Sequence, residues 1–513
     1  MGSSERQSIS QSLSLNIASI VSSENTVTQE DHSARSTGQN WFIEYWQGVK
    51  NWVSANRWPV VGIVLACLLT YAPVVQFEFI NWDDPWYIEN NDIIKGWHPA
   101  NLYAVATQSV ARNFAPLTIF TFLVEHTLWG LWSGGYHLTN VLLHVVNALL
   151  VFALIKRLSG NALAAWTIAI LFGLHPVQVE TVAWVSSRKT LLSATFMLAS
   201  CLCWLRTERT AHHEKWGIIW LVCGLLSKAA TVVIPPIVVA YDVLIARKKF
   251  SESVARQIVP MFFSVMLILI TMSAQTTIVG GVRGHIGASK LWIIAIDATI
   301  LWRYVAMSFW PQDLCVLYDP ATTGILHWIA LSLITWGAIA YAAYKYRERY
   351  PLPVFCFATW LLLLFPVLNI FPITTLMNDR YLYLPLVPFF GGVFALAGIA
   401  LQSLPNLDFT TTHKNPLPAM VTAIVLSAAA CGFYCLQTQT YLPTFANPVA
   451  LWSHARQTTP SLPVIHIQWA ITLHDEGYRD EAIQTLESAL LLNPDDGDRH
   501  RIEEKIAEWS QSV

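Results

Sequence analysis

Two adjacent carboxylates, Asp83 and Asp84, follow the first long apolar stretch of the chain and are flanked by tryptophans. Near a low-dielectric boundary each negative charge raises the cost of ionising the other, so one carboxylate is easily tuned toward a general base. The same Asp-Asp-Pro sequence is also good turn chemistry for a solvated loop. The pair therefore predicts either a catalytic base or an ordinary turn, and other residues decide between them.

Cationic residues recur further along the chain, close to the ends of other apolar stretches. They are Arg188, Lys189, Lys228, Arg283 and Arg380, with Glu180, His285 and Asp379 nearby. Ionisable groups at membrane depth are costly unless they have a function. Arg and Lys that converge beside carboxylates suit an anionic, membrane-bound substrate such as a lipid phosphate. A single cation of this kind would be explained by snorkelling to the interface, but five on one face favour an anion site.

The composition indicates the environment of these residues. Of the 513 residues, 54% are hydrophobic and 12% are charged, and the net charge is −2. A soluble protein of this size needs about twice that charged share, which excludes a cytosolic enzyme. No basic field exists to attract nucleic acid. We therefore expect an all-α polytopic membrane protein whose partners include membrane lipid but not nucleic acid.

Eleven apolar stretches are candidates for membrane spans of about 20 residues or somewhat fewer. They are 58–77, 136–155, 161–175, 190–205, 216–228, 231–246, 257–276, 326–344, 353–371, 382–402 and 417–437. Lys and Arg clusters, which mark cytoplasmic loops, place the N-terminus inside and loops 78–115, 176–189, 277–325 and 372–381 outside. The stretch 290–310 carries Asp297 and Arg303, and we expect it to be interfacial or re-entrant. That gives about eleven crossings and an external C-terminus.

The chain has three regions of different character. Residues 1–50 are polar and predict a disordered cytoplasmic tail, and residues 51–437 form the transmembrane domain. Residues 438–513 contain a period of 34, since Ala455 matches Ala489 and Pro460 matches Pro494. This period predicts a short external tetratricopeptide-repeat domain in preference to an unrelated helical hairpin. Because so few repeats are unstable alone, we expect them to lean on the membrane domain, a second copy or a partner.

The ordered set of short motifs resembles the GT-C superfamily of membrane glycosyltransferases, and most closely the transmembrane-and-tetratricopeptide-repeat group related to protein O-mannosyltransferases. The matching segments are Asn81–Asn90, Pro116–Thr118, Tyr136–Asn140, His175–Glu180, Trp184, Arg188-Lys189 and Asp379–Pro385. The resemblance covers about residues 58–500. Members of the group often have an acidic residue where this chain has Thr190 and a proline where it has Ala229.

The resemblance implies a GT-C type bundle and an inverting glycosyltransferase. Such an enzyme moves a sugar from a polyprenyl-phosphate donor to a Ser or Thr hydroxyl of a protein, on the external face, with the protein acceptor docked by the repeats. It implies Asp83 as the base with Asp84 as its partner. Substrate binding falls to Glu180, Arg188, Lys189, Lys228, Arg283, His285, Asp379 and Arg380. The short repeat array favours a bacterial inner membrane with a periplasmic active site.

Several alternatives stay open. Two carboxylates and a phosphate would suit Mg²⁺ or Mn²⁺ through oxygen ligands, and the metal dependence is undecided. A second possible function is a glycosyltransferase that modifies a lipid or a polysaccharide and whose repeats dock an assembly partner. A non-catalytic membrane scaffold whose repeats dock partners is the third function. A transporter is disfavoured because we find no inverted repeat and the acidic pair lies in a loop.

Overall fold

The computed structural model describes residues 50–111, 113–276, 289–369, 375–402 and 417–511, together with Gln47. The predicted disordered tail therefore lies outside the described residues, apart from Gln47 and Lys50. The chain divides at Arg57 into two units, of which the second is Trp58–Val513. In the described part of this unit every regular element is a helix, beside one isolated β-bridge between Val110 and Asn113.

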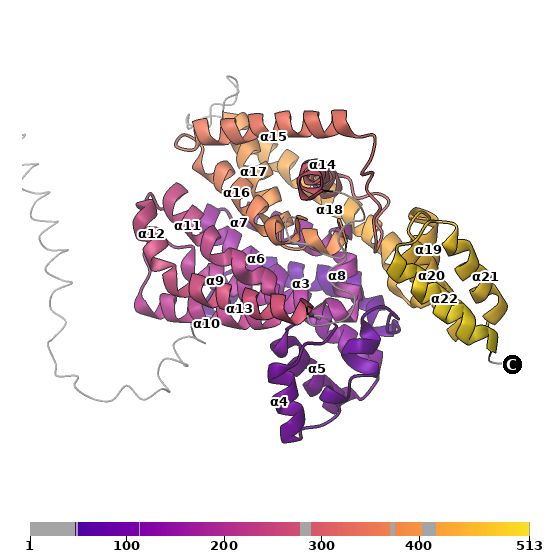
Figure 1. Ribbon diagram of the computed structural model, residues 1–513. Coiled ribbons are helices and arrows are strands. Elements are labelled where there is room, and N and C mark those ends of the chain that lie inside the picture. Colours follow the sequence, from indigo (N-terminus) through magenta and orange to yellow (C-terminus); the bar gives the residue numbers. More distant parts are fainter. Residues whose placement is uncertain are drawn as a thin grey trace, which may run out of the picture. The chain divides into compact units, whose positions relative to one another are not determined.

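Each of the eleven predicted spans coincides with a helix of the bundle in Figure 1. They are α3 (Arg57–Tyr71), α6 (Ser133–Ser159), α7 (Ala162–Leu174), α9 (Arg188–Trp204), α10 (Ala211–Ser227), α11 (Ile234–Leu244), α13 (Ile258–Thr276), α15 (Leu326–Tyr346), α16 (Pro351–Leu364), α17 (Leu386–Gln402) and α18 (Leu417–Tyr441). The all-α, multi-pass membrane architecture is thus as predicted. The apolar runs form helices because a bilayer offers no partner for backbone N–H and C=O groups.

Length and hydropathy support only some of the predicted crossings individually. Among the described residues four helices are long and apolar enough to cross a membrane, or up to six if each of two bent pairs is one span. The bends are 55° between α7 and Pro176–Ala183, and 58° between Phe250–Arg256 and Ile258–Thr271. Other helices, such as α16, are shorter than the roughly 20 residues of a straight span. The total of eleven crossings stays a prediction.

The stretch 290–310 forms one helix, α14 (Lys290–Phe309), which is long and apolar enough to cross by itself. However, both ends of α14 contact residues that are predicted to lie on the external side. Near its start, Trp292 Nε1 donates to the carbonyl of Thr322 at 2.9 Å. Near its end, the Ser308 carbonyl lies 3.2 Å from His175 Nε2. These contacts support the interfacial or re-entrant interpretation, whereas length alone would allow a crossing.

Two helices were not predicted: one lies in the first predicted external loop, 78–115, and the other in the segment between that loop and the span predicted to begin at 136. Two short helices, α4 (Pro99–Thr107) and α5 (Pro116–Trp129), lie beside each other in Figure 1. Proline at the first position suits the start of each helix, because its missing N–H would have no intrahelical partner there. Gly130, with φ of 59°, ends α5. The helix α5 carries Glu125, which becomes important for the site.

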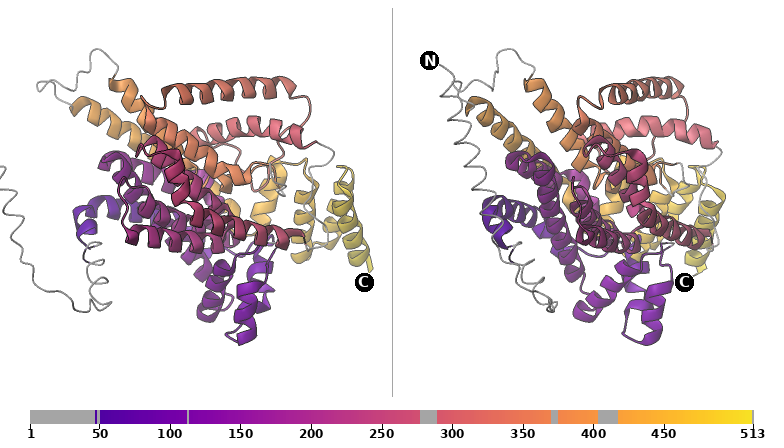
Figure 2. Two further views of the ribbon diagram at one scale, coloured as in Figure 1. Left: turned by 60° about the vertical axis from the view of Figure 1, so that its left-hand side comes forward. Right: turned by 90° about the vertical axis from the view of Figure 1, so that its left-hand side faces the viewer.

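Four helices follow the membrane bundle: α19 (Pro448–Thr458), α20 (Pro463–Asp475), α21 (Arg479–Leu490) and α22 (Asp496–Gln511). They form the yellow group in Figures 1 and 2. Apolar side chains at helical spacing build a separate small core, which includes Ala470, Ala482, Leu486, Ala489 and Ile502. The equivalent residues Ala455 and Ala489, 34 positions apart, lie in α19 and α21, the first and third of the four helices. The assignment of these helices as tetratricopeptide repeats stays a prediction.

The sidedness leads to a labelling prediction. Single cysteines replacing Asn90 or Asp475, both exposed, should react with an impermeant thiol reagent from outside intact cells or vesicles, whereas one replacing the exposed Lys249 should not. The reason is that Lys249 lies in a basic cluster predicted to be cytoplasmic. Labelling is read by mass against the parent protein, which controls for its eight native cysteines. Labelling of position 475 only after permeabilisation would mean that α14 crosses the membrane.

Candidate active site

The two carboxylates of the acidic pair have different environments. Asp84 is fully buried, and both of its oxygens accept hydrogen bonds from protein groups. The backbone N–H of Ile80 donates to Oδ2 at 2.8 Å, the N–H of Ser186 donates to Oδ1 at 2.9 Å, and the Ser186 hydroxyl also donates to Oδ1. Asp84 therefore ties the first external loop to the second, and it is not presented to a substrate.

Asp83 is the accessible member of the pair, with 25% of its side chain exposed. Lys189 Nζ lies 3.3 Å from Asp83 Oδ2 and 3.3 Å from the hydroxyl of the buried Tyr87. The same ammonium lies 4.8 Å from the centre of the Tyr87 ring. Lys189 belongs to the first turn of α9, so this helix brings a cation directly to the candidate base.

Two further cations converge on this pair. Arg380 forms an ion pair with the fully buried Glu180, and its backbone N–H donates to Glu180 Oε2 at 2.8 Å. The Arg380 charge also interacts with Asp83. Lys228 donates to the hydroxyl of Thr190 at 2.9 Å, and its charge interacts with those of Lys189 and Arg380. Lys189 and Arg380 thus lie near the accessible carboxylate of Asp83, and Lys228 lies near these two cations.

Arg188 lies next to Lys189 in sequence but has a different environment. It is fully buried, and its nitrogens donate to Glu125 Oε2 at 2.7 Å, to the Tyr136 carbonyl at 2.8 Å and to the Asn140 side chain. These partners come from α5 and α6. Arg188 was predicted to bind substrate, but its donors face the protein interior, where they hold α5 and α9 together.

Asp379 is likewise buried and engaged by protein groups. The Tyr318 hydroxyl donates to Oδ1, and the Tyr441 hydroxyl lies 3.2 Å from Oδ2. Burial, followed by the charge of Glu180, raises the pKa of Asp379 well above its usual range. Asp379 thus links the segment that carries Arg380 to Tyr318 and to Tyr441 at the end of α18. It was predicted to bind substrate and is placed instead to support its neighbour.

Two predicted site residues, Arg283 and His285, lie outside the described residues. In the part of the chain that the structure does describe, no group of three His, Cys, Asp or Glu side chains is arranged to hold a metal ion. The acidic pair does not fit a divalent cation as a unit, because Asp84 turns both oxygens to Ile80 and Ser186 while Asp83 pairs with Lys189. We therefore derive no step through Mg²⁺ or Mn²⁺.

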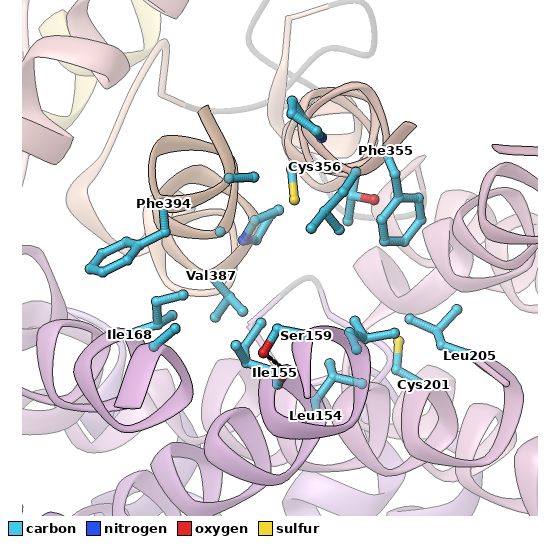
Figure 3. A pocket seen from close by; sticks show the side chains of 18 of the residues that line it. Leu154, Ile155, Ser159, Ile168, Cys201, Leu205, Phe355, Cys356, Val387 and Phe394 are labelled. Carbon is cyan, nitrogen blue, oxygen red and sulfur yellow. Dashed lines mark hydrogen bonds between the residues drawn. The ribbon is translucent and has the colours of Figure 1, made fainter. Parts of the chain in front are cut away.

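An apolar cavity of about 900 Å³ lies between two groups of helices, with α6, α7 and α9 on one side and α16 and α17 on the other (Figure 3). Leu154, Ile155, Ile168 and Cys201 face Phe355, Cys356, Val387 and Phe394 across it. Three helices that line it carry the site cations at or just before their first turns: Lys189 in α9, Lys228 before α11 and Arg380 before α17. None of these three cations lines the cavity itself, whose lining extends from Leu384 to Ser159, Leu205 and Arg349.

The pKa of Asp84 leads to a pH prediction. Burial raises it to about 7, although the bonds from Ser186 and Ile80 lower it. An exposed aspartate ionises near pH ~3.9, so the folded protein retains a proton here that the unfolded chain loses. The resulting stabilisation is complete below about pH 4 and is lost as the pH rises through about 7.

Asp84→Asn cannot ionise and should lack this pH dependence. Relative to wild type, its melting temperature in detergent should rise by about 2–6 °C between pH 5 and pH 8. The exposed Asp92 serves as a control through Asp92→Asn, which should follow wild type at every pH. Parallel melting curves for wild type and Asp84→Asn across this range would contradict the buried, proton-retaining carboxyl.

The sequence analysis did not single out several residues that complete the site. Glu125, the partner of Arg188, was detectable as the one carboxylate in an apolar helix. Tyr318 and Tyr441 gave no such signal, because their partner Asp379 is 61 and 62 residues away in sequence. Only folding brings such residues together.

No family model matches the chain. The chain is 24% identical over 492 residues to the protein O-mannosyl-transferase F38B6.6 of Caenorhabditis elegans, a match that covers 90% of this chain and 65% of the relative. It is 27% identical over 191 residues to the human protein O-mannosyl-transferase TMTC2, covering 36% of this chain and 22% of that protein. The chain thus spans about two thirds of the worm relative's length and a smaller share of the human one.

Two solved structures match most of the chain, at low sequence identity and with TM-scores below 0.5. The Archaeoglobus fulgidus oligosaccharyltransferase, solved with a tethered acceptor peptide, has a TM-score of 0.45 and 14% identity, covering 84% of this chain and 59% of that one. ArnT from Cupriavidus metallidurans, solved with undecaprenyl phosphate, has a TM-score of 0.37 and 14% identity, covering 81% of each chain. The relationship indicated by the motifs is supported by the curated relatives: the chain is similar to protein O-mannosyl-transferases, to F38B6.6 along most of its length and to TMTC2 over about a third of it.

Proposed function

We propose that this protein is an inverting glycosyltransferase that moves a sugar from a polyprenyl-phosphate donor to a Ser or Thr hydroxyl of a protein. The observation that carries the proposal is the gathering of Lys189, Lys228 and Arg380 beside the accessible Asp83. The names of the relatives support protein O-glycosylation. The alternative of a non-catalytic scaffold does not explain why three loops bring costly charges to one point.

Asp83 is the proposed general base. It accepts the proton of the acceptor hydroxyl while the hydroxyl oxygen attacks the anomeric carbon and the bond from that carbon to the donor phosphate breaks. The accessible carboxylate is suited to this role, and its buried neighbour Asp84 holds the loop through Ser186 and Ile80. Lys189, 3.3 Å from Asp83 Oδ2, orients the Asp83 carboxylate. Asp84 is therefore a positioning partner.

The three cations are proposed to bind the donor phosphate and to stabilise the charge that develops on it as it departs. Arg380 offers a planar guanidinium, which suits phosphate oxygens, although Glu180 already engages part of it. Lys228 hydrogen-bonds the uncharged Thr190, and among the described residues no carboxylate forms an ion pair with it, although the charge of Glu180 acts on it. The three cations carry more positive charge than Asp83 and Glu180 carry negative charge, and this excess favours an anionic ligand.

The apolar cavity supports a lipid-linked donor. A phosphate held at the cation cluster would have its isoprenoid chain leave along α9, which contains Lys189 in its first turn, and along α11 and α17, which follow Lys228 and Arg380 in sequence; all three helices line the cavity. Their apolar lining residues are Met197, Leu198, Ile234, Ile237, Leu384 and Val387. Burying each CH₂ of the chain there would contribute about 0.8 kcal/mol. A water-soluble nucleotide sugar would leave the cavity unused.

Filling the cavity should weaken binding of a long lipid selectively. Ala395 lines the cavity in α17, and Ala395→Phe should raise KM about 10-fold for a long-chain polyprenyl donor through lost contact and overpacking. A donor with a very short chain should be unaffected. Ala397→Phe is the matched control, because Ala397 lies in the same helix but is exposed and does not line the cavity. Equal KM values for both variants with both donors would remove the cavity from the donor site.

The helices α19–α22 are proposed to be tetratricopeptide repeats that dock the protein acceptor. Repeats of this kind stack to form concave surfaces that bind extended peptides. They lie beside the acidic loop, since the Trp452 ring lies 5.2 Å from the Trp82 ring. A docked acceptor would have a raised local concentration at Asp83. A periplasmic site in a bacterial inner membrane stays a prediction.

The function is tested with the full chain in lipid nanodiscs. Polyprenyl-phosphate mannose and other polyprenyl-phosphate hexoses are supplied with Ser/Thr peptides and with whole proteins, and sugar transfer is read by mass spectrometry. Transfer of one hexose to a Ser or Thr side chain supports the proposal. Transfer only to a lipid or polysaccharide acceptor would replace it with the second function. Failure with every donor and acceptor would favour the scaffold.

A further inference from the structure

We infer that the C-terminal helices are part of the catalytic machinery, with Trp452 and Thr472 acting through Asn81 as positioning residues for Asp83. The inference rests on the proposed function and adds residues to its active site. The C-terminal helices were expected to lean on the membrane domain, a second copy or a partner, and to dock the protein acceptor. In addition, polar side chains of α19 and α20 grip the loop that carries the candidate base.

The side chain of Asn81 bridges the two helices. Trp452 Nε1 in α19 donates to Asn81 Oδ1 at 2.7 Å, and Asn81 Nδ2 donates to the Thr472 hydroxyl in α20 at 3.0 Å. The orientation of the amide is determined, because an indole N–H can only donate and must face the oxygen. The Thr472 hydroxyl uses its own proton toward the Gln468 carbonyl at 2.9 Å, which leaves it as the acceptor for Asn81.

These contacts are buried on the side of the C-terminal helices and partly exposed at Asn81. Trp452 is fully buried and Thr472 is 2% exposed. Hydrogen bonds in such surroundings are strong, and a donor or acceptor left unpaired there is costly. The backbone adds a second connection, since the Glu78 N–H donates to the Ala446 carbonyl at 2.9 Å just before α19. The loop is therefore held to the C-terminal helices at positions 78 and 81.

The opposite side of the same loop is held by Asp84, which binds Ile80 and Ser186. Asp83 lies between Asn81 and Asp84, and its own side chain makes no contact with the C-terminal helices in the part of the chain that is described. The loop is clamped on both sides of the residue whose carboxylate must meet the acceptor. A misplacement of about 1 Å in such a group can cost 10²-fold in rate, so we expect the clamp to act on the chemical step.

The test uses the full chain with two substitutions, of which Thr472→Val preserves the shape of the side chain and Trp452→Phe makes a buried ring smaller. Thr472→Val removes the hydroxyl at nearly constant volume, and Trp452→Phe removes the indole N–H. Each should lower kcat about 5–50-fold with a short Ser/Thr peptide, with KM for the donor nearly unchanged, because the base is misplaced while the anion site is intact. Thr472→Ser retains the hydroxyl and should restore kcat.

Matched controls come from the same helical group. Thr485→Val removes a hydroxyl that donates within α21, and Trp469→Phe retains a ring for Arg456 of α19 while leaving the Asn81 hydrogen bonds unchanged. Neither should change kcat. If the substitutions only destabilise the fold, the melting temperature should fall in test and control variants alike, and kcat of the folded fraction should stay unchanged. That result would overturn the inference.

A second measurement does not depend on sugar transfer. Amide hydrogen exchange of residues 78–90 should be faster in Thr472→Val and Trp452→Phe than in wild type and in the two controls. If the wild type transfers no sugar but exchange rises as expected, the proposed function fails while the clamp stands. Unchanged exchange, or faster exchange with kcat at the wild-type value, would overturn the positioning role.

Discussion

Asp83→Asn should lower kcat by about 10²–10⁴-fold, the usual range for loss of a general base. The amide has the shape of the carboxylate but cannot accept the proton of the attacking hydroxyl. Donor binding should be largely retained, because Lys189, Lys228 and Arg380 all stay in place, and Lys189 loses only one partner 3.3 Å away. The experiment measures turnover of purified variant and wild type, with donor affinity determined separately.

The control for this experiment is a carboxylate of the same loop outside the site. Asp92 is exposed and pairs with Lys95 at 2.9 Å in solvent, so Asp92→Asn should leave turnover unchanged. Asp84→Asn should reduce turnover by a different route, because it disturbs the bonds from Ile80 and Ser186 that hold the loop. Near-normal turnover of Asp83→Asn would show that another group takes the proton.

Arg380→Met should lower kcat/KM by about 10²–10³-fold, the cost of removing a charge-stabilising group from a transition state. It should also destabilise the protein by about 3–5 kcal/mol, because it leaves the fully buried Glu180 without its charged partner. The two effects have separate causes, and a second substitution separates them. In Arg380→Met with Glu180→Gln, no unpaired buried charge remains.

The double variant should therefore recover most of the lost melting temperature but none of the lost activity. Arg256→Met is the matched control, because Arg256 forms a surface ion pair with Glu252 and its loss should change neither quantity measurably. Recovery of both stability and activity in the double variant would mean that Arg380 serves only to neutralise Glu180. Loss of stability without loss of activity in Arg380→Met would lead to the same conclusion.

Much of the fold was predictable from local features of the sequence. Apolar runs of nearly span length predict helices, because the backbone must satisfy its own hydrogen bonds in lipid, and all eleven runs are helices. Helices α4 and α5 were not predicted, because no cluster of charged residues marks the ends of these short segments. The crossing status of α14 was also beyond the sequence, because hydropathy measures apolar content and not where the two ends of a helix lie.

The chemical type of the site also followed from the sequence, and its division of roles did not. Asp83 and Asp84 are identical in type, yet one is accessible and the other fully buried. Adjacent residues on a helix point about 100° apart, so Arg188 enters the interior toward Glu125 while Lys189 reaches Asp83. The sequence by itself determined that charges collect at the predicted external ends of apolar helices. Only the tertiary structure decided which of them meet, because Lys189, Lys228, Arg380 and the Asn81 clamp come from segments that are distant in sequence and are brought together by helix packing.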